Sequence, residues 1–483
     1  MFSADMTIRV AIVGGGVAGL AAALELRRHA DEGRDVSFAL FERSPRLGGK
    51  ILSERVDGHI LDGGPDCFLT EKPAVHRLAR RMGIEQELLS SDESRKRTMI
   101  LAGGKLHDLP DGVMMMVPTR MLPFATTGLF TLRGKARMGL DLLIPRRRSG
   151  GDESLASFVT RRMGRECLDR LAEPLVGGLH ASDPETMSLE ATFPRLLEME
   201  RQHGSLIRGF VAARRRMANA RREPAPAGAR PRTFFTSFRG GMQQLTEATA
   251  DAAGREWITT GVGVDALERT GSGWRLRLTN GTVEDADAVI LATEAWAAAG
   301  LLEPLDGGVG EALAAIPHSS SATISLAFRS SDVRIDTNAF GFLCPQAAGR
   351  RLLAATYSST KWPGRAPEDR FLIRVVMGGP HDQAILEQPD DSLVETARAE
   401  LSAILGLDAE PQLARVYRWK RGMPQYTMGH IDRVAFVDRW LAEQAGLAIA
   451  GGSYRGVGVP NCIESGEAAV AKVVADRAAG LGR

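Results

Sequence analysis

The sequence predicts a mixed α/β (α+β) fold in which the main domain is assembled from separate stretches of the chain. The first observation is a glycine-rich turn, Gly14–Gly19, directly after a short apolar run. The second is another glycine-rich segment, Ala450–Glu467, near the far end of the chain. The third is a region at residues 90–231, where apolar clusters are interrupted by cations. We therefore expect a discontinuous Rossmann-like domain, a mixed-sheet domain and a helical insert.

The first glycine-rich turn has the residue order of a phosphate-binding strand-turn-helix unit. Ile8–Val13 is nearly all apolar, as in a parallel strand buried on both faces, and Val17–His29 has helical composition. Gly14 permits the tight turn, Gly16 lets the backbone approach a pyrophosphate, and Gly19 lets the helix pack on the strand. Gly15, Val17 and Ala18 complete the predicted contact, since the helix N-terminus attracts phosphate. The alternative is a merely structural glycine turn.

A second strand follows and ends in an acid. The strand Val36–Phe41 is followed by Glu42, which can hold the hydroxyls of an adenosine ribose. Arg43 and the pair Gly49-Lys50 come next, where basic and glycine residues can meet the ribose and pyrophosphate again. Two glycine-rich ends that share one cofactor indicate FAD.

Composition fits a large enzyme and excludes few function classes. The chain has 483 residues, 44% of them hydrophobic, and a formal net charge of +2, so nothing favours nucleic acid as a partner. The four cysteines lie far apart without a CxxC pair, so we expect no metal site and no disulfide scaffold. The start of the chain lacks a signal-peptide pattern, which makes the cytoplasm the default location.

The region 90–231 carries much of the positive charge. Arg146–Arg148, Arg214–Arg216 and Arg221 with Arg222 accompany apolar clusters such as Val113–Pro118, and no window reaches the length of a membrane span. This pattern fits a helical insert that lies on an anionic membrane surface, at the cytoplasmic face. A solvated basic face over a methionine-rich core fits equally well. The Pro/Ala/Gly stretch 223–231 is typical of a flexible linker.

The segment Glu42–Pro65 resembles the extended motif of the flavin amine oxidase superfamily. In that family the turn that here reads Gly63-Gly64-Pro65 passes near the flavin ring. The resemblance divides the chain into an FAD-binding domain (1–89, 232–300 and 440–483), the helical insert (90–231) and a substrate-binding domain (301–439). The cofactor contacts expected beyond the first turn are Glu42, Arg43, Gly49, Lys50, Gly63, Gly64, Pro65, Asp66, Val264, Thr293, Gly452, Val457, Gly458 and Val459.

Two further motifs narrow the resemblance. The run Pro424–His430 (PQYTMGH) and the segment GGSYRGVGVPNCIESGE near the end are similar to the protoporphyrinogen oxidase family, specifically its bacterial porphyrinogen-oxidising branch. The likeness spans nearly the whole chain. It implies FAD-dependent oxidation of a porphyrinogen to a porphyrin in haem biosynthesis, with dioxygen as acceptor. Because the flavin carries the chemistry, no residue is nominated as catalytic.

The same resemblance suggests where a tetrapyrrole binds. Phe340, Gly341 and Leu343 are candidates to grip the macrocycle, with Val376 and Met377 on a neighbouring strand as weaker ones. Lys72 and Arg97 are candidates to pair with a propionate.

Several alternatives stay open at this stage. The substrate is protoporphyrinogen IX, which the family favours slightly, or coproporphyrinogen III. An amine oxidase or carotenoid desaturase would share the fold, and a non-catalytic flavin-binding protein would share the nucleotide end. Members of the family often dimerise, which suggests a homodimer.

Overall fold

The computed structural model describes residues 7–110, 113–114, 117–118, 121–147, 150–220, 233–271 and 273–480. Its nucleotide-type sheet is parallel, with the order β12-β2-β1-β16-β22. The strands are β1 (Ile8–Val13), β2 (Val36–Glu42), β12 (Ile258–Thr260), β16 (Ala288–Leu291) and β22 (Leu447–Ile449). Because these strands come from three stretches of the chain, the expected discontinuous Rossmann-like sheet is present.

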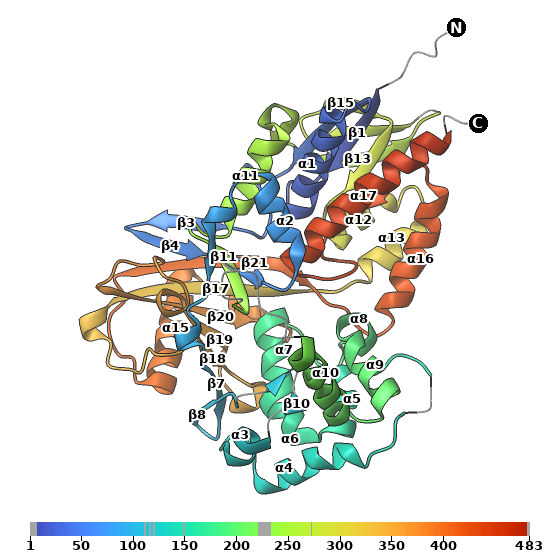
Figure 1. Ribbon diagram of the computed structural model, residues 1–483. Helices are drawn as coiled ribbons and strands as arrows, with labels where there is room; N and C mark the ends of the chain where they lie inside the picture. Colours follow the sequence, from blue (N-terminus) through green and yellow to red (C-terminus); the bar gives the residue numbers. More distant parts are fainter. Residues whose placement is uncertain are drawn as a thin grey trace.

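Alternating side chains of this sheet bury into two separate cores. Val10 and Ile12 pack into one core, and Ala11 and Val13 pack into the other, as expected for a strand buried on both faces. The first face is covered by α1 (Val17–Asp31), α2 (Pro73–Arg81), α11 (Gln243–Ala253) and α17 (Val459–Gly480). The second face is covered by β13 (Val264–Arg269), β14 (Trp274–Leu278), β15 (Val283–Ala286), α12 (Ala295–Leu302), α13 (Gly307–Ala314) and α16 (His430–Glu443). Figure 1 shows these layers in its upper half.

A seven-stranded mixed sheet lies below the nucleotide domain (Figure 1). Its order is β21-β17-β20-β19-β18-β7-β8, and all neighbours are antiparallel except β18 and β7. The strands are β7 (Thr98–Ala102), β8 (Lys105–Asp108), β17 (His318–Arg329), β18 (Gly341–Leu343), β19 (Leu352–Tyr357), β20 (Arg370–Gly378) and β21 (Leu413–Pro424). One face packs on α15 (Asp390–Leu405), which contributes Leu393, Ala397 and Leu401 to the core.

The sheet takes in residues from the stretch 90–231, which the sequence analysis assigns to a helical insert. Met99 and Leu101 enter the core beside α15, whereas Ile100 and Ala102 enter the core of the insert. A strand that is buried on both faces has no polar alternation, so its sheet partner is not visible in the sequence. The predicted domain boundaries otherwise stay a prediction.

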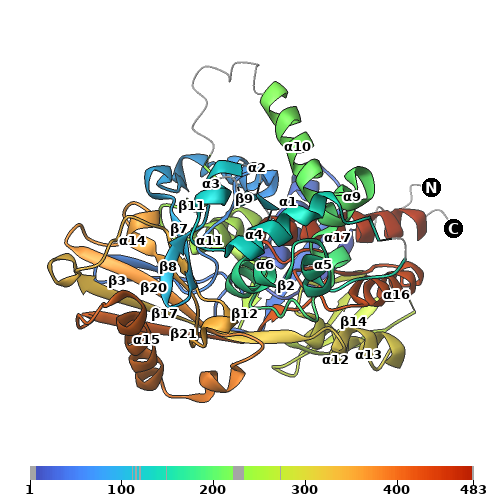
Figure 2. The same ribbon diagram turned by 90° about the horizontal axis from the view of Figure 1, so that it is seen from below.

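Most of the rest of the insert is helical. Its helices are α3 (Met121–Thr126), α4 (Leu132–Gly139), α5 (Leu155–Arg162), α6 (Arg165–Cys167), α7 (Glu173–His180), α8 (Leu189–Thr192), α9 (Pro194–His203) and α10 (Leu206–Ala220). Of the apolar cluster 113–118, residues 113–114 and 117–118 form two short antiparallel strands, and the remaining two residues lie outside the described residues, as does the linker 223–231. Figure 2 shows α10 projecting from the body of the insert.

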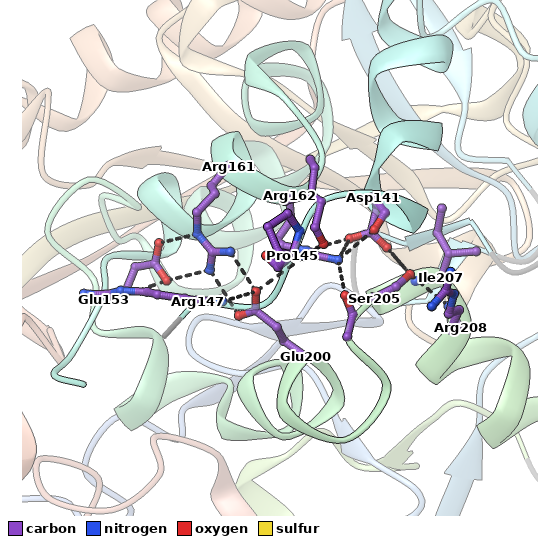
Figure 3. Close-up of polar contacts among 12 residues, drawn as sticks. Asp141, Pro145, Arg147, Glu153, Arg161, Arg162, Glu200, Ser205, Ile207 and Arg208 are labelled. Atoms are coloured by element: carbon purple, nitrogen blue, oxygen red, sulfur yellow. Dashed lines mark hydrogen bonds and ion pairs between the residues drawn. The ribbon is translucent and has the colours of Figure 1, made fainter. Parts of the chain in front are cut away.

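A buried ionic cluster holds the insert together (Figure 3). The guanidinium of Arg162, which is fully buried, donates to the Asp141 carboxylate over 2.6 Å and to the carbonyl oxygen of Gly204 over 2.9 Å. Its neighbour Arg161 forms ion pairs with Glu153 at 2.9 Å and Glu200 at 2.7 Å. Since buried charges need partners, these contacts tie α5 to the α9–α10 turn.

The smaller elements are β3 (Ser53–Val56), β4 (His59–Asp62), β5 (Phe68–Leu69), β6 (Leu88–Ser90), β9 (Val113–Met114), β10 (Val117–Pro118), β11 (Phe235–Phe238) and α14 (Ser358–Lys361). They include a three-stranded sheet, β5-β11-β6, and the two-stranded pairs β3-β4 and β9-β10. Within the described part of the chain, no helix has the length and apolar character needed to cross a membrane.

Candidate active site

The first glycine-rich turn has the geometry that its sequence predicts. Gly14 has φ +107°, and a Cβ added there would lie 2.6 Å from the carbonyl oxygen of Ala292. A Cβ on Gly19 would lie 1.9 Å from the carbonyl oxygen of Gly14, so the start of α1 fits against the strand only without a side chain. Gly16, in contrast, has open space at its Cβ position, and no side chain caps the helix that it begins. The free N–H groups at this end of α1 can therefore bind an anion.

Glu42 and Arg43 lie at the end of β2, beside this turn. The Glu42 carboxylate accepts hydrogen bonds from the backbone N–H groups of Gly15 at 2.6 Å and Ser44 at 2.7 Å. Arg43 donates to the Asp265 carboxylate at 2.7 Å and to the Val264 carbonyl oxygen at 3.2 Å. These contacts fix the acid next to Gly15 and connect β2 with β13, which brings the predicted contacts Glu42, Arg43 and Val264 together.

Lys50 belongs to a network that the sequence analysis does not anticipate. Its ammonium lies 2.6 Å from the carboxylate of Glu294, which also lies 3.2 Å from His318 Nε2 and accepts from the Ser453 hydroxyl at 3.1 Å. Burial opposes ionisation of Glu294, but His318 and Lys50 outweigh it and lower the pKa of Glu294 to about 2. Gly49 lies against Gly16, since a Cβ on Gly49 would be 3.2 Å from the Gly16 Cα. The network thus joins both glycine-rich ends to β17.

The turn Gly63-Gly64-Pro65 is held against the mixed sheet. The carbonyl oxygen of Gly63 accepts from the Thr323 hydroxyl at 2.6 Å and from the Trp419 indole at 2.8 Å. The carbonyl oxygen of Gly64 accepts from Arg374 at 2.6 Å. Side chains of β17, β20 and β21 therefore position this turn from below.

Asp66 follows the turn and is surrounded by polar side chains. Its carboxylate lies 2.8 Å from the Lys361 ammonium, accepts from the Trp362 indole at 3.0 Å and lies 3.6 Å from Arg374. Burial favours the neutral acid, but Lys361 and Arg374 dominate and hold the pKa of Asp66 far below its ordinary value. Burial also raises the pKa of the neighbouring Cys67 thiol to about 12, so this cysteine stays a thiol.

The closing segment brings the second glycine-rich end beside the first. α17 begins at Val459, and a Cβ on Gly466 would lie 2.1 Å from the carbonyl oxygen of Ala18 in α1. Gly466 is seven residues inside α17, a distance of about 10 Å along a helix axis. Val457 and Gly458 immediately precede this N-terminus, and Gly452 lies earlier in the same loop.

The candidate substrate residues divide between two faces of the mixed sheet. Strand pairing places Leu343 and Val376 on the face that carries Thr323, and on this face Leu343 enters the core of the insert whereas Thr323 binds Gly63. Met377 has the opposite orientation and is fully buried in the core beside α15. Because adjacent residues of a strand point to opposite faces, the predicted pairing of Val376 with Met377 on one substrate surface does not hold.

Gly341 has a structural constraint that the sequence analysis does not foresee. Its φ is +137°, and a Cβ would lie 1.9 Å from the carbonyl oxygen of Ala355 in the paired strand. A substitution such as Gly341→Phe would therefore displace β19 and not merely fill a substrate slot. Phe340, next to it, is buried and donates its backbone N–H to the Arg97 carbonyl oxygen at 2.7 Å.

The candidate propionate partners differ in how their charge is compensated. The Arg97 guanidinium pairs with Asp108 at 3.0 Å and with Asp336 at 2.7 Å. Lys72, at the start of α2, has no carboxylate partner among the described residues. Among the described residues, the charge of Lys72 is therefore less compensated than that of Arg97.

Among the described residues, two kinds of polar group near the glycine-rich turn lack a hydrogen-bond partner that a bound FAD could supply. The start of α1 offers uncapped N–H groups, and the hydroxyl of Thr293 is buried without a hydrogen-bond partner in the described structure. Buried polar groups normally have partners, and a bound dinucleotide can supply them at both positions. The residues present fit the cofactor. This site on a discontinuous parallel sheet, joined to a mixed sheet, defines a dinucleotide-binding flavoprotein.

Comparison with known proteins identifies the family. The model of the flavin containing amine oxidoreductases matches residues 17–474, and the chain belongs to this family. FAD as cofactor and the mixed α/β fold are thereby confirmed.

Several similar proteins are named as porphyrinogen oxidases. The chain is 34% identical to a coproporphyrinogen III oxidase of Bacillus subtilis, over 95% of this chain and 97% of that protein. It is 34% identical to a coproporphyrinogen III oxidase of Propionibacterium freudenreichii (96% and 90%) and 28% identical to protoporphyrinogen oxidase 1 of Arabidopsis thaliana (95% and 86%). A solved protein of Exiguobacterium sp. 255-15, assigned as a protoporphyrinogen oxidase, superposes with a TM-score of 0.83 at 30% identity, over 98% and 99% of the two chains. The resemblance stated from the sequence motifs is confirmed.

Proposed function

We propose that the protein is an FAD-dependent oxidase that converts coproporphyrinogen III to coproporphyrin III in haem synthesis. The observation that carries the choice of substrate is the pattern of identities. The bacterial coproporphyrinogen III oxidases are 34% identical over nearly the full chain, whereas the plant protoporphyrinogen oxidase is 28% identical. The slight preference for protoporphyrinogen IX drawn from the sequence is therefore reversed.

The reaction removes six electrons and six protons from the macrocycle. FAD, when bound, accepts two electrons at a time and passes them to dioxygen, so one porphyrinogen consumes three dioxygen and yields three hydrogen peroxide. The protein supplies orientation and excludes water. Proton loss can follow from tautomerism of the macrocycle, so no side chain is assigned as a catalytic base.

Particular residues of the chain have roles in this proposal. The sheet face with Gly341, Leu343 and Val376 supports the macrocycle, and Lys72 pairs with a propionate. The N-terminus of α17 points its positive end toward the reacting ring, where negative charge develops on reduction.

Purified holoenzyme assayed with both porphyrinogens tests this proposal. We expect kcat/KM for coproporphyrinogen III to exceed that for protoporphyrinogen IX by about tenfold or more, the ratio that about 1.4 kcal/mol of preference gives. The reverse order would overturn the choice of substrate. Oxidation of primary amines without turnover of either porphyrinogen would overturn the function.

We also propose that the insert docks on an anionic membrane surface. Large apolar side chains are exposed on α4, on the turn after it and on α10, namely Leu132 at 82%, Leu140 at 47%, Leu142 at 41%, Leu143 at 78% and Val211 at 36%. Arg133 and Arg208 are exposed beside them, and Arg208 donates to the Leu142 carbonyl oxygen at 3.1 Å. Exposed apolar residues flanked by cations are typical of interfacial binding.

Sedimentation with lipid vesicles tests the docking proposal. The protein should sediment with vesicles that contain phosphatidylglycerol at low salt. Leu143→Asp should weaken this binding about tenfold, since it puts a negative charge where an exposed leucine would enter the anionic membrane surface. Equal recovery in the supernatant with neutral and anionic vesicles would overturn it. A homodimer stays a prediction.

A further inference from the structure

The segment Pro424–His430, singled out by its sequence, lies where three parts of the molecule meet. The backbone N–H of Gln425 donates to the Pro317 carbonyl oxygen at 2.8 Å, next to β17. On the insert side, the carbonyl oxygen of Tyr426 accepts from the Ser188 N–H at 2.8 Å. The Met428 N–H donates to the Thr186 carbonyl oxygen at 3.0 Å. The backbone of this segment is thus fixed to the mixed sheet and to the insert.

The side chain of Tyr426 contacts the third part of the molecule, the closing loop (451–456) that precedes α17. Its hydroxyl donates to the Gly452 carbonyl oxygen at 2.6 Å and accepts from the Gly456 N–H at 2.6 Å. The residue is 6% exposed, so water does not replace either bond. One phenol hydroxyl therefore spans the loop from Gly452 to Gly456.

His430 supports the same loop from the next turn of chain. Its Nε2 lies 2.8 Å from the Tyr454 carbonyl oxygen, which can only accept, so Nε2 carries the proton. The imidazole stacks on the Tyr426 ring at 4.1 Å with 17° between the planes. Burial lowers the pKa of His430 to about 4, and the ring stays neutral at physiological pH.

The loop that these side chains hold leads directly into Val457–Val459 at the start of α17. Its backbone turns at Gly451 with φ +122° and at Gly456 with φ +106°, conformations that leave it few constraints of its own. At the first of these glycines, the Gly451 N–H donates to the Ser465 hydroxyl of α17 at 3.0 Å. From Gly452 to Gly456, the side-chain contacts to the loop backbone from outside come from Tyr426 and His430, as far as the described residues show.

We propose that Tyr426 and His430 are positioning residues that set the placement of the segment Val457–Val459 against the flavin. The inference rests on the proposed function, because it takes this segment to face the flavin ring. The backbone of Tyr426 is fixed to the insert through Ser188, and its hydroxyl is fixed to the closing loop. Tyr426 therefore connects the substrate side of the molecule with the flavin side. Both residues act through the loop backbone and touch neither substrate nor reacting atoms.

Tyr426→Phe in the purified holoenzyme tests the proposal. The ring remains to stack on His430, but Gly452 and Gly456 each lose a hydrogen-bond partner in a buried setting. We expect the affinity of the apoprotein for FAD to fall about tenfold, with a shifted visible spectrum of bound flavin. We also expect kcat to fall about tenfold while KM for the porphyrinogen changes less than about twofold.

Tyr357→Phe is the matched control. Tyr357 is fully buried in the mixed-sheet core, and its hydroxyl has no hydrogen-bond partner among the described residues. Removing this hydroxyl should leave FAD affinity, the flavin spectrum and kcat unchanged. The comparison separates loss of a buried phenol from loss of the loop contact.

His430 provides a second test by rescue. His430→Ala should change the flavin spectrum and FAD affinity in the same direction as Tyr426→Phe. His430→Gln, which can extend an N–H toward the Tyr454 carbonyl oxygen, should restore part of both.

The outcomes distinguish this inference from the proposed function. If Tyr426→Phe lowers only the thermal unfolding temperature, and FAD affinity, spectrum and kcat match those of Tyr357→Phe, the positioning role is wrong. If the wild-type protein binds FAD but oxidises no porphyrinogen, the proposed function fails, whereas the effects on FAD affinity and spectrum still test the loop contact.

Discussion

The ammonium of Lys361 lies 2.8 Å from the carboxylate of Asp66, although the two residues are 295 positions apart in the chain. Lys361 is only 7% exposed and also lies over the rings of Phe235 and Trp362. The pair connects the segment after the Gly63–Pro65 turn to α14, which follows β19 of the mixed sheet. It therefore helps to fix the turn in place.

Loss of one charge from this pair should destabilise the protein strongly. We expect Lys361→Met to lower the free energy of unfolding by about 3–5 kcal/mol, because it leaves the Asp66 carboxylate buried without its closest cation. Urea denaturation of the holoenzyme measures this. Lys420→Met, which removes the exposed ion pair with Glu387, should change the same quantity by less than about 1 kcal/mol. Equal effects of the two substitutions would contradict the assigned role of the buried pair.

Ionisation of Glu294 should make the free energy of unfolding decrease at acidic pH. The pKa of Glu294 is about 2 in the folded protein, below the ordinary value of 4.5. As the pH is lowered, this carboxylate is therefore protonated in the unfolded state before it is protonated in the folded state. The stabilisation by the ionised carboxylate is complete above about pH 4.5 and is lost as the pH falls toward about 2, by on the order of 2–3 kcal/mol.

Glu294→Gln should therefore reduce the loss of stability between about pH 6 and about pH 3. Denaturation curves at both pH values provide the measurement. Glu303→Gln is the control, since Glu303 is exposed and follows the other end of α12. An unchanged acid dependence in Glu294→Gln would show that another carboxyl group carries it.

Val376 and Met377 offer a test of which sheet face meets the substrate. Val376→Phe adds bulk on the face toward Gly63 and should lower kcat/KM for the porphyrinogen about tenfold, with FAD still bound. Met377→Leu conserves volume in the core beside α15 and should cost less than about 1.5 kcal/mol of stability without changing KM. A larger kinetic effect from Met377→Leu than from Val376→Phe would place the substrate on the other face.

Lys72 should contribute to carboxylate recognition. We expect Lys72→Ala to raise KM for coproporphyrinogen III about tenfold, because a propionate loses its cationic partner, and Lys72→Arg to keep most of the affinity. Arg97→Ala, whose guanidinium is already paired with two aspartates, should alter KM less than about twofold. Steady-state kinetics on the three variants show whether Lys72 or Arg97 binds the propionate.

Local patterns in the sequence predict much of the nucleotide domain. The strand Ile8–Val13 has the same bounds in the structure as in the sequence prediction. The predicted helix Val17–His29 and strand Val36–Phe41 begin at the observed residues and end within two residues of the observed ends, because continuous burial and helical spacing are local signals. The glycine turn is equally local, since its spacing directly reflects the strand-turn-helix geometry.

Contacts between distant segments could not be predicted in this way. Periodicity does not show that Asp66 meets Lys361, or that the Arg97 guanidinium is occupied by Asp108 and Asp336. The motif Pro424–His430 was informative as a pattern, but the role of Tyr426 became visible only with the closing loop beside it. The face of Met377 likewise depended on which side of the sheet α15 covers.

Anaerobic mixing of the purified holoenzyme with coproporphyrinogen III tests the central claim most directly. The flavin absorbance should bleach, and admission of dioxygen should restore it with formation of coproporphyrin III and three hydrogen peroxide for each porphyrin. Flavin that stays oxidised in the presence of excess porphyrinogen, while the protein retains its FAD, would contradict the proposed function.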